Sequence, residues 1–202
     1  AYLYLNCSVN GSQQLSFDLL HCLNRGWRDV GSRRVYWMEY ADACQAVWIE
    51  EVDGKAYLFS ADSGTGKSTH TKQWQNYFGK ERALIINDDK PAIRKDKNGW
   101  AAYGTPFSGK TDENLNRKAI LQGICMLERG NENAIERIGV WEAIPLLMRQ
   151  TIVPRSEKMA GELLAILDTL LSEVPVYRMK CTISKEAVVT AYEKMKGDQD
   201  ED

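Results

Sequence analysis

The segment ADSGTGKS, residues 61–68, has the residue types of a loop that binds phosphate groups. Gly64 and Gly66 allow backbone conformations in which successive N–H groups point at one centre. Lys67 supplies a cation for the β- and γ-phosphates of a nucleotide, and the Ser68 hydroxyl is a ligand for Mg²⁺. The segment therefore predicts a site for ATP or GTP with Mg²⁺.

The sequence around this loop has the required order, a strand before it and a helix after it. The apolar run Lys55–Ala61 predicts the strand, and residues 68–78 predict the helix. Ala61 stands where the pattern G-x-x-x-x-G-K-[ST] begins with glycine, and we expect this smallest of changes to be tolerated. The alternative, a glycine-rich turn without a ligand, is disfavoured by this context. The predicted nucleotide-binding residues are Ser63, Gly64, Thr65, Gly66, Lys67, Ser68 and Thr69.

Two adjacent acids, Asp88 and Asp89, end the next apolar strand, Arg82–Asp88. One carboxylate can hold Mg²⁺ together with Ser68, while the other accepts a proton from an attacking hydroxyl. The residues alone leave open which acid has which role, and Lys67 is the third expected catalytic residue. Adjacent acids often only end a strand, so this prediction depends on the upstream loop.

Other charged residues leave two interpretations open. Residues 104–118 contain Lys110, Arg117 and Lys118, which could place a cation on the transferred phosphoryl group or could be the surface charges of a turn. His70 follows the loop, and an exposed helical histidine is favoured over a ligand. The remaining cationic candidates are Lys90, Arg94, Arg149 and Arg155.

The composition is that of an ordinary globular domain, with 202 residues of which 44% are hydrophobic and 27% are charged. A net charge of −2 gives no reason to expect nucleic acid or an anionic membrane as a partner. No run approaches the ~20 apolar residues of a membrane span. The five cysteines are odd in number and include no C-x-x-C pair, which favours reduced thiols and a cytoplasmic location.

Two short turn sequences predict antiparallel hairpins, Asp53-Gly54 and Lys97-Asn98-Gly99. They favour a mixed sheet over a parallel one, in a single α/β domain of residues 1–196 with a disordered acidic tail, 197–202. Further predicted strands are Tyr2–Asn6, Arg34–Tyr40, Gln45–Val52, Ile120–Glu128 and Pro175–Cys181. Further predicted helices are Val140–Gln150, interrupted at Pro145, then 156–172 with Ser156 as N-cap, and Ser184–Met195.

SGTGKST followed by a strand ending in NDD resembles the nucleotide site of phosphoenolpyruvate carboxykinases, and ADSGTGKS followed by DD is similar to the catalytic domain of HPr kinase/phosphorylase. Small bacterial proteins related to these kinases resemble the chain over residues 55–195, including segments 104–110, 116–130 and 175–181. The resemblance implies the mixed β-sheet P-loop fold that both families share. It also implies that Asp89 lies on the acceptor side as the base, which leaves Asp88 as the metal ligand beside Ser68. Thr69 stands where HPr kinase usually has a glutamate, so HPr is not the expected acceptor.

These observations predict an ATP-dependent phosphotransferase that moves a phosphoryl group to a hydroxyl of a peptide, protein or small molecule. One alternative is a nucleotide-binding accessory or regulatory protein with little turnover. Another is an activity related to phosphoenolpyruvate carboxykinase, for which the chain is short. The expected partners are the nucleotide, the acceptor and, by analogy with the related kinases, a second copy of the chain.

Overall fold

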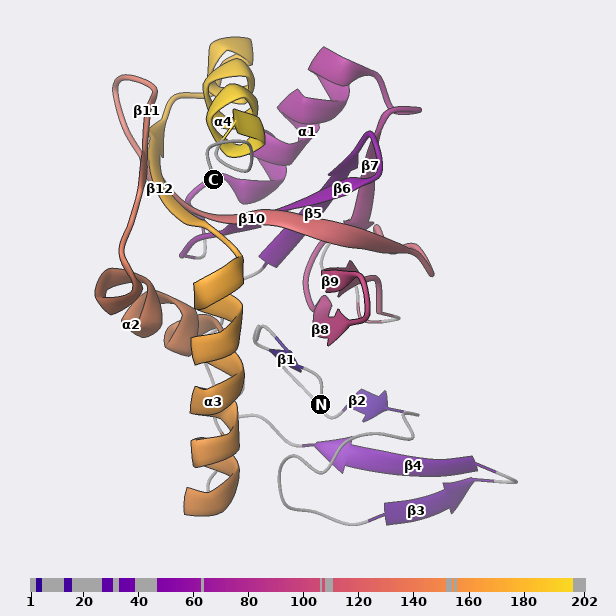
Figure 1. The fold of residues 1–202 in the computed structure, drawn as a ribbon. Helices are drawn as coiled ribbons and strands as arrows, with labels where there is room; N and C mark the ends of the chain where they lie inside the picture. The colour runs from indigo at the N-terminus through magenta and orange to yellow at the C-terminus, as the bar shows by residue number, and fades with distance from the viewer. Residues whose placement is uncertain are drawn as a thin grey trace.

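The computed structural model describes residues 3–4, 13–15, 27–30, 33–38, 47–62, 64–105, 107, 111–151, 154 and 156–197. Its described strands form a nine-stranded sheet and a separate three-stranded antiparallel sheet (Figure 1). The small sheet has the order β2 (Gln13–Leu15), β4 (Arg33–Met38), β3 (Trp27–Val30). The large sheet has the order β1 (Leu3–Tyr4), β8 (Ala92–Asp96), β9 (Gly99–Tyr103), β10 (Lys118–Arg129), β6 (Lys55–Ser60), β5 (Val47–Val52), β7 (Ala83–Asn87), with β12 (Val176–Cys181) beside β10 and β11 (Ala134–Arg137) beside β12.

Strand β10 organises the large sheet because it pairs with three neighbours. It is parallel to β6 and to β12, and its first residues are antiparallel to β9. On the other side of β6, strand β5 is antiparallel to both β6 and β7. The sheet is therefore mixed, which confirms the fold class expected from the hairpin sequences.

Both predicted hairpins are present. Asp53 and Gly54 join β5 to β6 with φ of 51° and 80°, the left-handed conformations that a two-residue turn of this kind needs. Lys97 and Asn98 join β8 to β9, and Gly99 follows them with φ of 105°. In both hairpins the residues of the turn itself determine that the two flanking strands pair antiparallel.

Helices cover the two faces of the large sheet, as Figure 1 shows. Alternate residues of β6 are buried against different layers: Tyr57 and Phe59 pack with the α1 and α4 side, whereas Ala56 and Leu58 pack with the α2 and α3 side. The large sheet and its helices thus form three layers, with the sheet in the middle. The helices of the described residues are α1 (Lys67–Phe78), α2 (Val140–Gln150), α3 (Glu157–Glu173) and α4 (Lys185–Gly197).

The helix boundaries agree with those expected from the sequence to within two residues, but the break expected at Pro145 is absent. Helix α2 is continuous through this proline, so the expected interruption is wrong. The proline removes one backbone donor, whose acceptor would be the carbonyl of Trp141, and Trp141 is 88% exposed, so water can replace the lost bond. Helix α3 begins after Ser156, whose hydroxyl accepts from the Met159 N–H at 3.3 Å, as predicted.

Helix α4 extends to Gly197, and the rest of the acidic tail lies outside the described residues. Of the five cysteines, Cys125 is fully buried in the core and Cys181 is half-buried; both are free thiols, as expected. The other three lie outside the described residues. In the part of the chain that the structure describes, we find no helix with the length and apolar character needed to cross a bilayer.

Candidate active site

The glycine-rich loop and the acid pair lie at the same edge of the sheet. Strands β6 and β7 are both antiparallel to β5, so they run in the same direction. At their carboxyl ends, Ser60 pairs with Val47 and Asn87 pairs with Ile49. Only β5 separates the two ends, so they are about 10 Å apart, two strand spacings. The structure thus brings together the two groups that the sequence singled out.

The two glycines of the loop between β6 and α1 have the unusual backbone conformations that only glycine adopts readily. Gly64 has φ of 78° and Gly66 has φ of 110°, both in the left-handed region. Gly66 is also the N-cap of α1 and has no side chain to accept from the first-turn N–H groups. This is the arrangement in which a helix N-terminus binds an anion. Ser63 lies outside the described residues.

The first loop position needs no glycine in this protein. Ala61 is buried and does not have a left-handed backbone conformation. Its methyl group packs in the core with Tyr57 and Phe59 of β6. The substitution of glycine by alanine at this position is therefore compatible with the loop, as expected.

The Lys67 side chain turns back over the start of the loop. Its ammonium donates to the carbonyls of Ala61 and Asp62 at 2.6 and 2.9 Å. Lys67 is only 6% exposed. Removing an ammonium group from water is costly unless polar groups replace the water, and the two loop carbonyls do so here. The charge is thus held against the first two residues of the loop.

Arg129 is a loop contact that sequence reasoning missed. Its guanidinium donates to the carbonyl of Gly64 through one Nη and to that of Thr65 through Nε, the latter at 3.3 Å. The contact follows from register: Met126 of β10 pairs with Ser60, and Arg129 lies three residues further on. The sequence signal for this contact was only that Arg129 is a charged residue at the end of a long apolar strand.

The two acids are buried next to one another but have different partners. Asp88 is 1% exposed, and its Oδ2 accepts a hydrogen bond from the Thr111 hydroxyl. Asp89 is 8% exposed, and its Oδ2 forms an ion pair with the Lys90 ammonium. One carboxylate therefore faces a hydroxyl and the other faces a cation.

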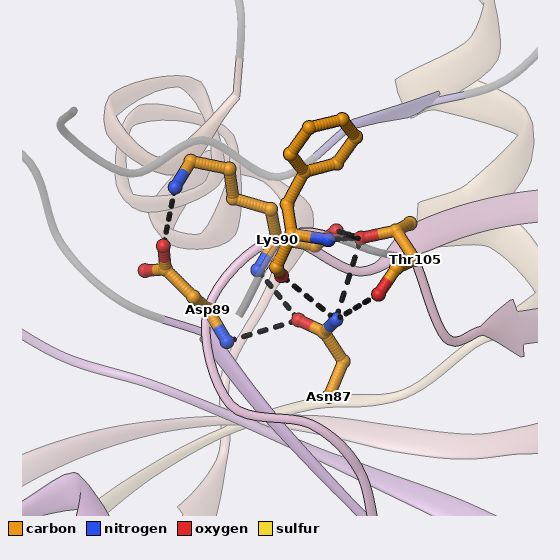
Figure 2. Close-up of polar contacts among 5 residues, drawn as sticks. Asn87, Asp89, Lys90 and Thr105 are labelled. Atoms are coloured by element: carbon orange, nitrogen blue, oxygen red, sulfur yellow. Dashed lines mark hydrogen bonds and ion pairs between the residues drawn. The ribbon is translucent and has the colours of Figure 1, made fainter. Parts of the chain in front are cut away.

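Asn87 holds the turn after β7, and Figure 2 shows its side chain among Asp89, Lys90 and Thr105. Its side-chain oxygen accepts from the N–H groups of Asp89 and Lys90 at 2.9 and 2.6 Å. Its amide nitrogen donates to the carbonyls of Thr105 and Phe107 at 3.1 and 3.0 Å. The side chain is fully buried, so these bonds replace water entirely. Sequence reasoning missed this role as well, because the acceptors lie eighteen to twenty residues away.

His70 is buried rather than exposed, which corrects the expectation from the sequence. It is 5% exposed, and its Nε2 accepts from the Trp74 indole N–H at 3.1 Å. The neutral ring therefore carries its proton on Nδ1, which faces the Cys181 sulfur at 4.0 Å. Burial lowers the pKa of His70 to about 4. A neutral histidine in these contacts anchors α1 to the sheet.

Within the described part of segment 104–118, the cations Arg117 and Lys118 do not reach the loop. Arg117 pairs with Glu51, and Lys118 pairs with Asp96. Glu51 lies opposite Ala56, four residues before the end of β6, so the Arg117 pair is about 13 Å along the strand from the loop. These residues therefore match the surface-charge interpretation. Lys110 and Arg155 lie outside the described residues, Arg94 is on β8, and Arg149 is exposed at the end of α2.

No protein-family model matches the chain, and no curated protein matches it. Among solved structures, the chain is similar to the HPr(Ser) kinase/phosphatase from Coxiella burnetii. The two are 10% identical, with a TM-score of 0.41, over 75% of this chain and 97% of that one. A similarity this distant does not establish a shared function, so the site is interpreted below from its own residues.

Proposed function

We propose that the protein is a Mg²⁺-dependent phosphotransferase that moves a phosphoryl group from ATP or GTP to a hydroxyl of a peptide, protein or small molecule. The observation that carries the proposal is the burial of Lys67, Asp88 and Asp89 at one edge of the sheet, beside a loop with left-handed glycines. Buried charges rarely add stability, whereas they are typical of sites that bind or transform a charged ligand.

The loop residues would bind the phosphates. The backbone of Gly64–Thr69 and the N-terminus of α1 offer N–H groups and a positive dipole end, and Lys67 adds a full charge. Ser63 belongs to the same proposed set by its place in the sequence. Phosphoryl transfer depends mainly on such positioning and on neutralising charge, so these parts suffice for the donor half of the reaction.

A magnesium ion would be held by Ser68 and one carboxylate of the acid pair, and when bound it would neutralise the charge on the phosphates. Within the described residues, no group of three or more His, Cys, Asp or Glu side chains could hold a metal. This agrees with Mg²⁺, which usually takes one or two protein ligands and completes its shell with phosphate oxygens and water.

The contacts of the two acids favour an assignment of roles opposite to the order expected from the sequence. A general base must lie within hydrogen-bond reach of the proton that it accepts, and Asp88 already accepts from a hydroxyl, that of Thr111. Asp89 then remains for the metal, and its carboxylate would exchange its ion pair with the Lys90 ammonium for Mg²⁺. We therefore propose Asp88 as the base and Asp89 as the magnesium ligand beside Ser68.

Titration calorimetry with Mg-ATP and Mg-GTP tests the donor half of the proposal. We expect binding that Lys67→Ala weakens by about 10- to 100-fold, the usual effect of losing hydrogen bonds to a charged group. Lys72→Ala is the matched control, because Lys72 is on the same helix but exposed. A folded protein that binds neither nucleotide at millimolar concentration would exclude the proposal.

A screen of peptides and small alcohols with labelled nucleotide tests the acceptor half. Transfer to a hydroxyl that disappears in Lys67→Ala supports the phosphotransferase. Binding of nucleotide without transfer to any acceptor would favour the accessory protein with little turnover.

A further inference from the structure

We propose that Thr111 is an internal phosphoryl acceptor, phosphorylated by the active site of its own chain; this inference rests on the proposed function. Its hydroxyl donates to Oδ2 of Asp88, the acid whose contacts fit a general base. Thr111 is exposed, whereas Asp88 is 1% exposed. The threonine thus presents a hydroxyl from the surface to a buried carboxylate at the site.

The position of Thr111 is fixed by main-chain contacts with the end of β7. The Asp88 N–H donates to the Glu113 carbonyl at 3.1 Å, and the Leu115 N–H donates to the Ile86 carbonyl at 2.9 Å. Asn87 and Asn114 form an antiparallel bridge between these two bonds. Thr111 comes two residues before this paired stretch, so its approach to Asp88 is set by the backbone and not by its side-chain rotamer alone.

The chemical step balances with the groups at hand. Thr111 Oγ1 forms a bond to the γ-phosphorus, and the bond from that phosphorus to the β–γ bridging oxygen breaks. The nucleoside diphosphate leaves with the electron pair of that bond. The hydroxyl proton passes to the Asp88 carboxylate, with which it already forms a hydrogen bond. The product is a phosphothreonine and a nucleoside diphosphate.

A purely structural role makes a different prediction. Buried carboxylates need hydrogen-bond donors, and the Thr111 hydroxyl could simply be one of them. In that case it would stay unmodified while the enzyme turns over. Phosphorylation would instead place a dianion beside Asp88, and repulsion between like charges would move residue 111 away from the carboxylate.

The test is to incubate the full chain with Mg-ATP, remove the nucleotide, and measure the intact mass and the modified peptide. We expect one phosphoryl group per chain, on Thr111. Thr111→Val keeps the shape without the hydroxyl and should stay unmodified, whereas Thr111→Ser should be phosphorylated at position 111. Thr169→Val, at a half-buried position on α3, is the control and should be modified at Thr111 like the wild type. Modification at another residue instead would overturn the proposal.

A mixing experiment separates transfer within one chain from transfer between chains. Lys67→Ala keeps the acceptor but lacks the loop cation, and Thr111→Val keeps the loop but lacks the acceptor. Mixed together with Mg-ATP, neither should gain a phosphoryl group; labelling of the Lys67→Ala chain would show transfer between chains and contradict the proposal.

The same samples distinguish the two proposals. Nucleotide binding and transfer to an external acceptor, with Thr111 unmodified, would overturn this inference and leave the proposed function standing. Absence of nucleotide binding would overturn both.

Discussion

The hairpin edge of the large sheet lies at the amino ends of β6 and β7, beside the turn Asp53-Gly54, and the loop edge lies at their carboxyl ends. The two edges carry the same kinds of charged residue in opposite environments. At the hairpin edge, Arg82 pairs with Asp53 at 2.7 Å, and their side chains are 56% and 51% exposed. At the loop edge, Lys67, Asp88 and Asp89 are all buried. Exposed pairs contribute little to stability because water screens them, whereas buried charges oppose folding unless they are well paired. The contrast supports the proposed function at the loop edge without reference to any other protein.

Topology explains why the edges differ. Strands β6 and β7 are parallel to one another, so the loops that follow them open at the same edge. The other end of β6 is joined to β5 by the two-residue turn Asp53-Gly54, so no long loop precedes β6 there. Sites at the carboxyl ends of strands that run in the same direction are common in α/β proteins for this geometrical reason.

The largest expected effect comes from removing a carboxylate at the loop edge. Asp88→Asn should lower turnover with an external acceptor by about 10²- to 10⁴-fold, the usual contribution of a general base. Asp89→Asn should weaken the binding of Mg²⁺ and of the nucleotide, and it should also lower turnover. Initial rates and calorimetry at several Mg²⁺ concentrations measure both effects.

Asp53→Asn is the control from the hairpin edge. The chemical change is the same, and asparagine tolerates the φ of 51° at this position, so turnover should be unchanged. If all three variants keep full turnover, the contrast between the edges has no catalytic meaning.

His70 should make stability depend on pH near the loop. Its pKa is about 4 in the folded protein, below the ordinary value of 6.5. Below pH 6.5 the unfolded chain binds a proton that the folded chain does not, so stability should fall down to about pH 4, by about 3 kcal/mol. His70→Gln keeps an acceptor for Trp74 and cannot titrate, so its free energy of unfolding should fall less over this range. Identical urea-unfolding profiles for the two proteins would contradict the assignment.

Arg129→Ala tests whether the loop is held in place from β10. Losing two hydrogen bonds at an exposed position should weaken nucleotide binding by about three- to tenfold, because the carbonyls of Gly64 and Thr65 lose their donor. Thermal stability should stay the same. Arg137→Ala, an exposed arginine on β11, is the control for calorimetry. Equal affinities in the two variants would show that Arg129 does not order the loop.

The smallest effect is expected at the hairpin edge. Arg82→Ala breaks an exposed ion pair, so neither the Tm nor nucleotide affinity should change measurably. Differential scanning calorimetry at low and high salt measures this. A clear fall in Tm that salt abolishes would show that charges at this edge also matter.

Local sequence signals predicted the parts of the fold that neighbours in the chain determine. The turn at Asp53-Gly54 and the cap at Ser156 are set within a few residues, and both were correct. The continuous α2 was missed because proline propensity says nothing about whether water can reach the Trp141 carbonyl.

The parts of the site that escaped prediction depend on pairing between distant segments. Arg129 reaches the loop only because β10 is in a particular register with β6, across more than sixty residues of sequence. Thr111 reaches Asp88 because residues 113–115 pair with the end of β7. The burial of His70 depends on how α1 packs against β6 and β12, through Phe59 and Cys181. No periodicity within one segment contains this information.

The pairing of β10 on both sides has a consequence for the order in which the molecule opens. Ile124, Cys125 and Met126 pair with β6 along one side and with β12 along the other. Their amides can exchange with deuterium only when the layers separate, so they should be among the last to exchange. The end of β6 that leads into the loop is attached to this slowest-opening segment. The loop and the first turn of α1 lie outside this pairing, so their amides should exchange earlier than those of the strand that carries them.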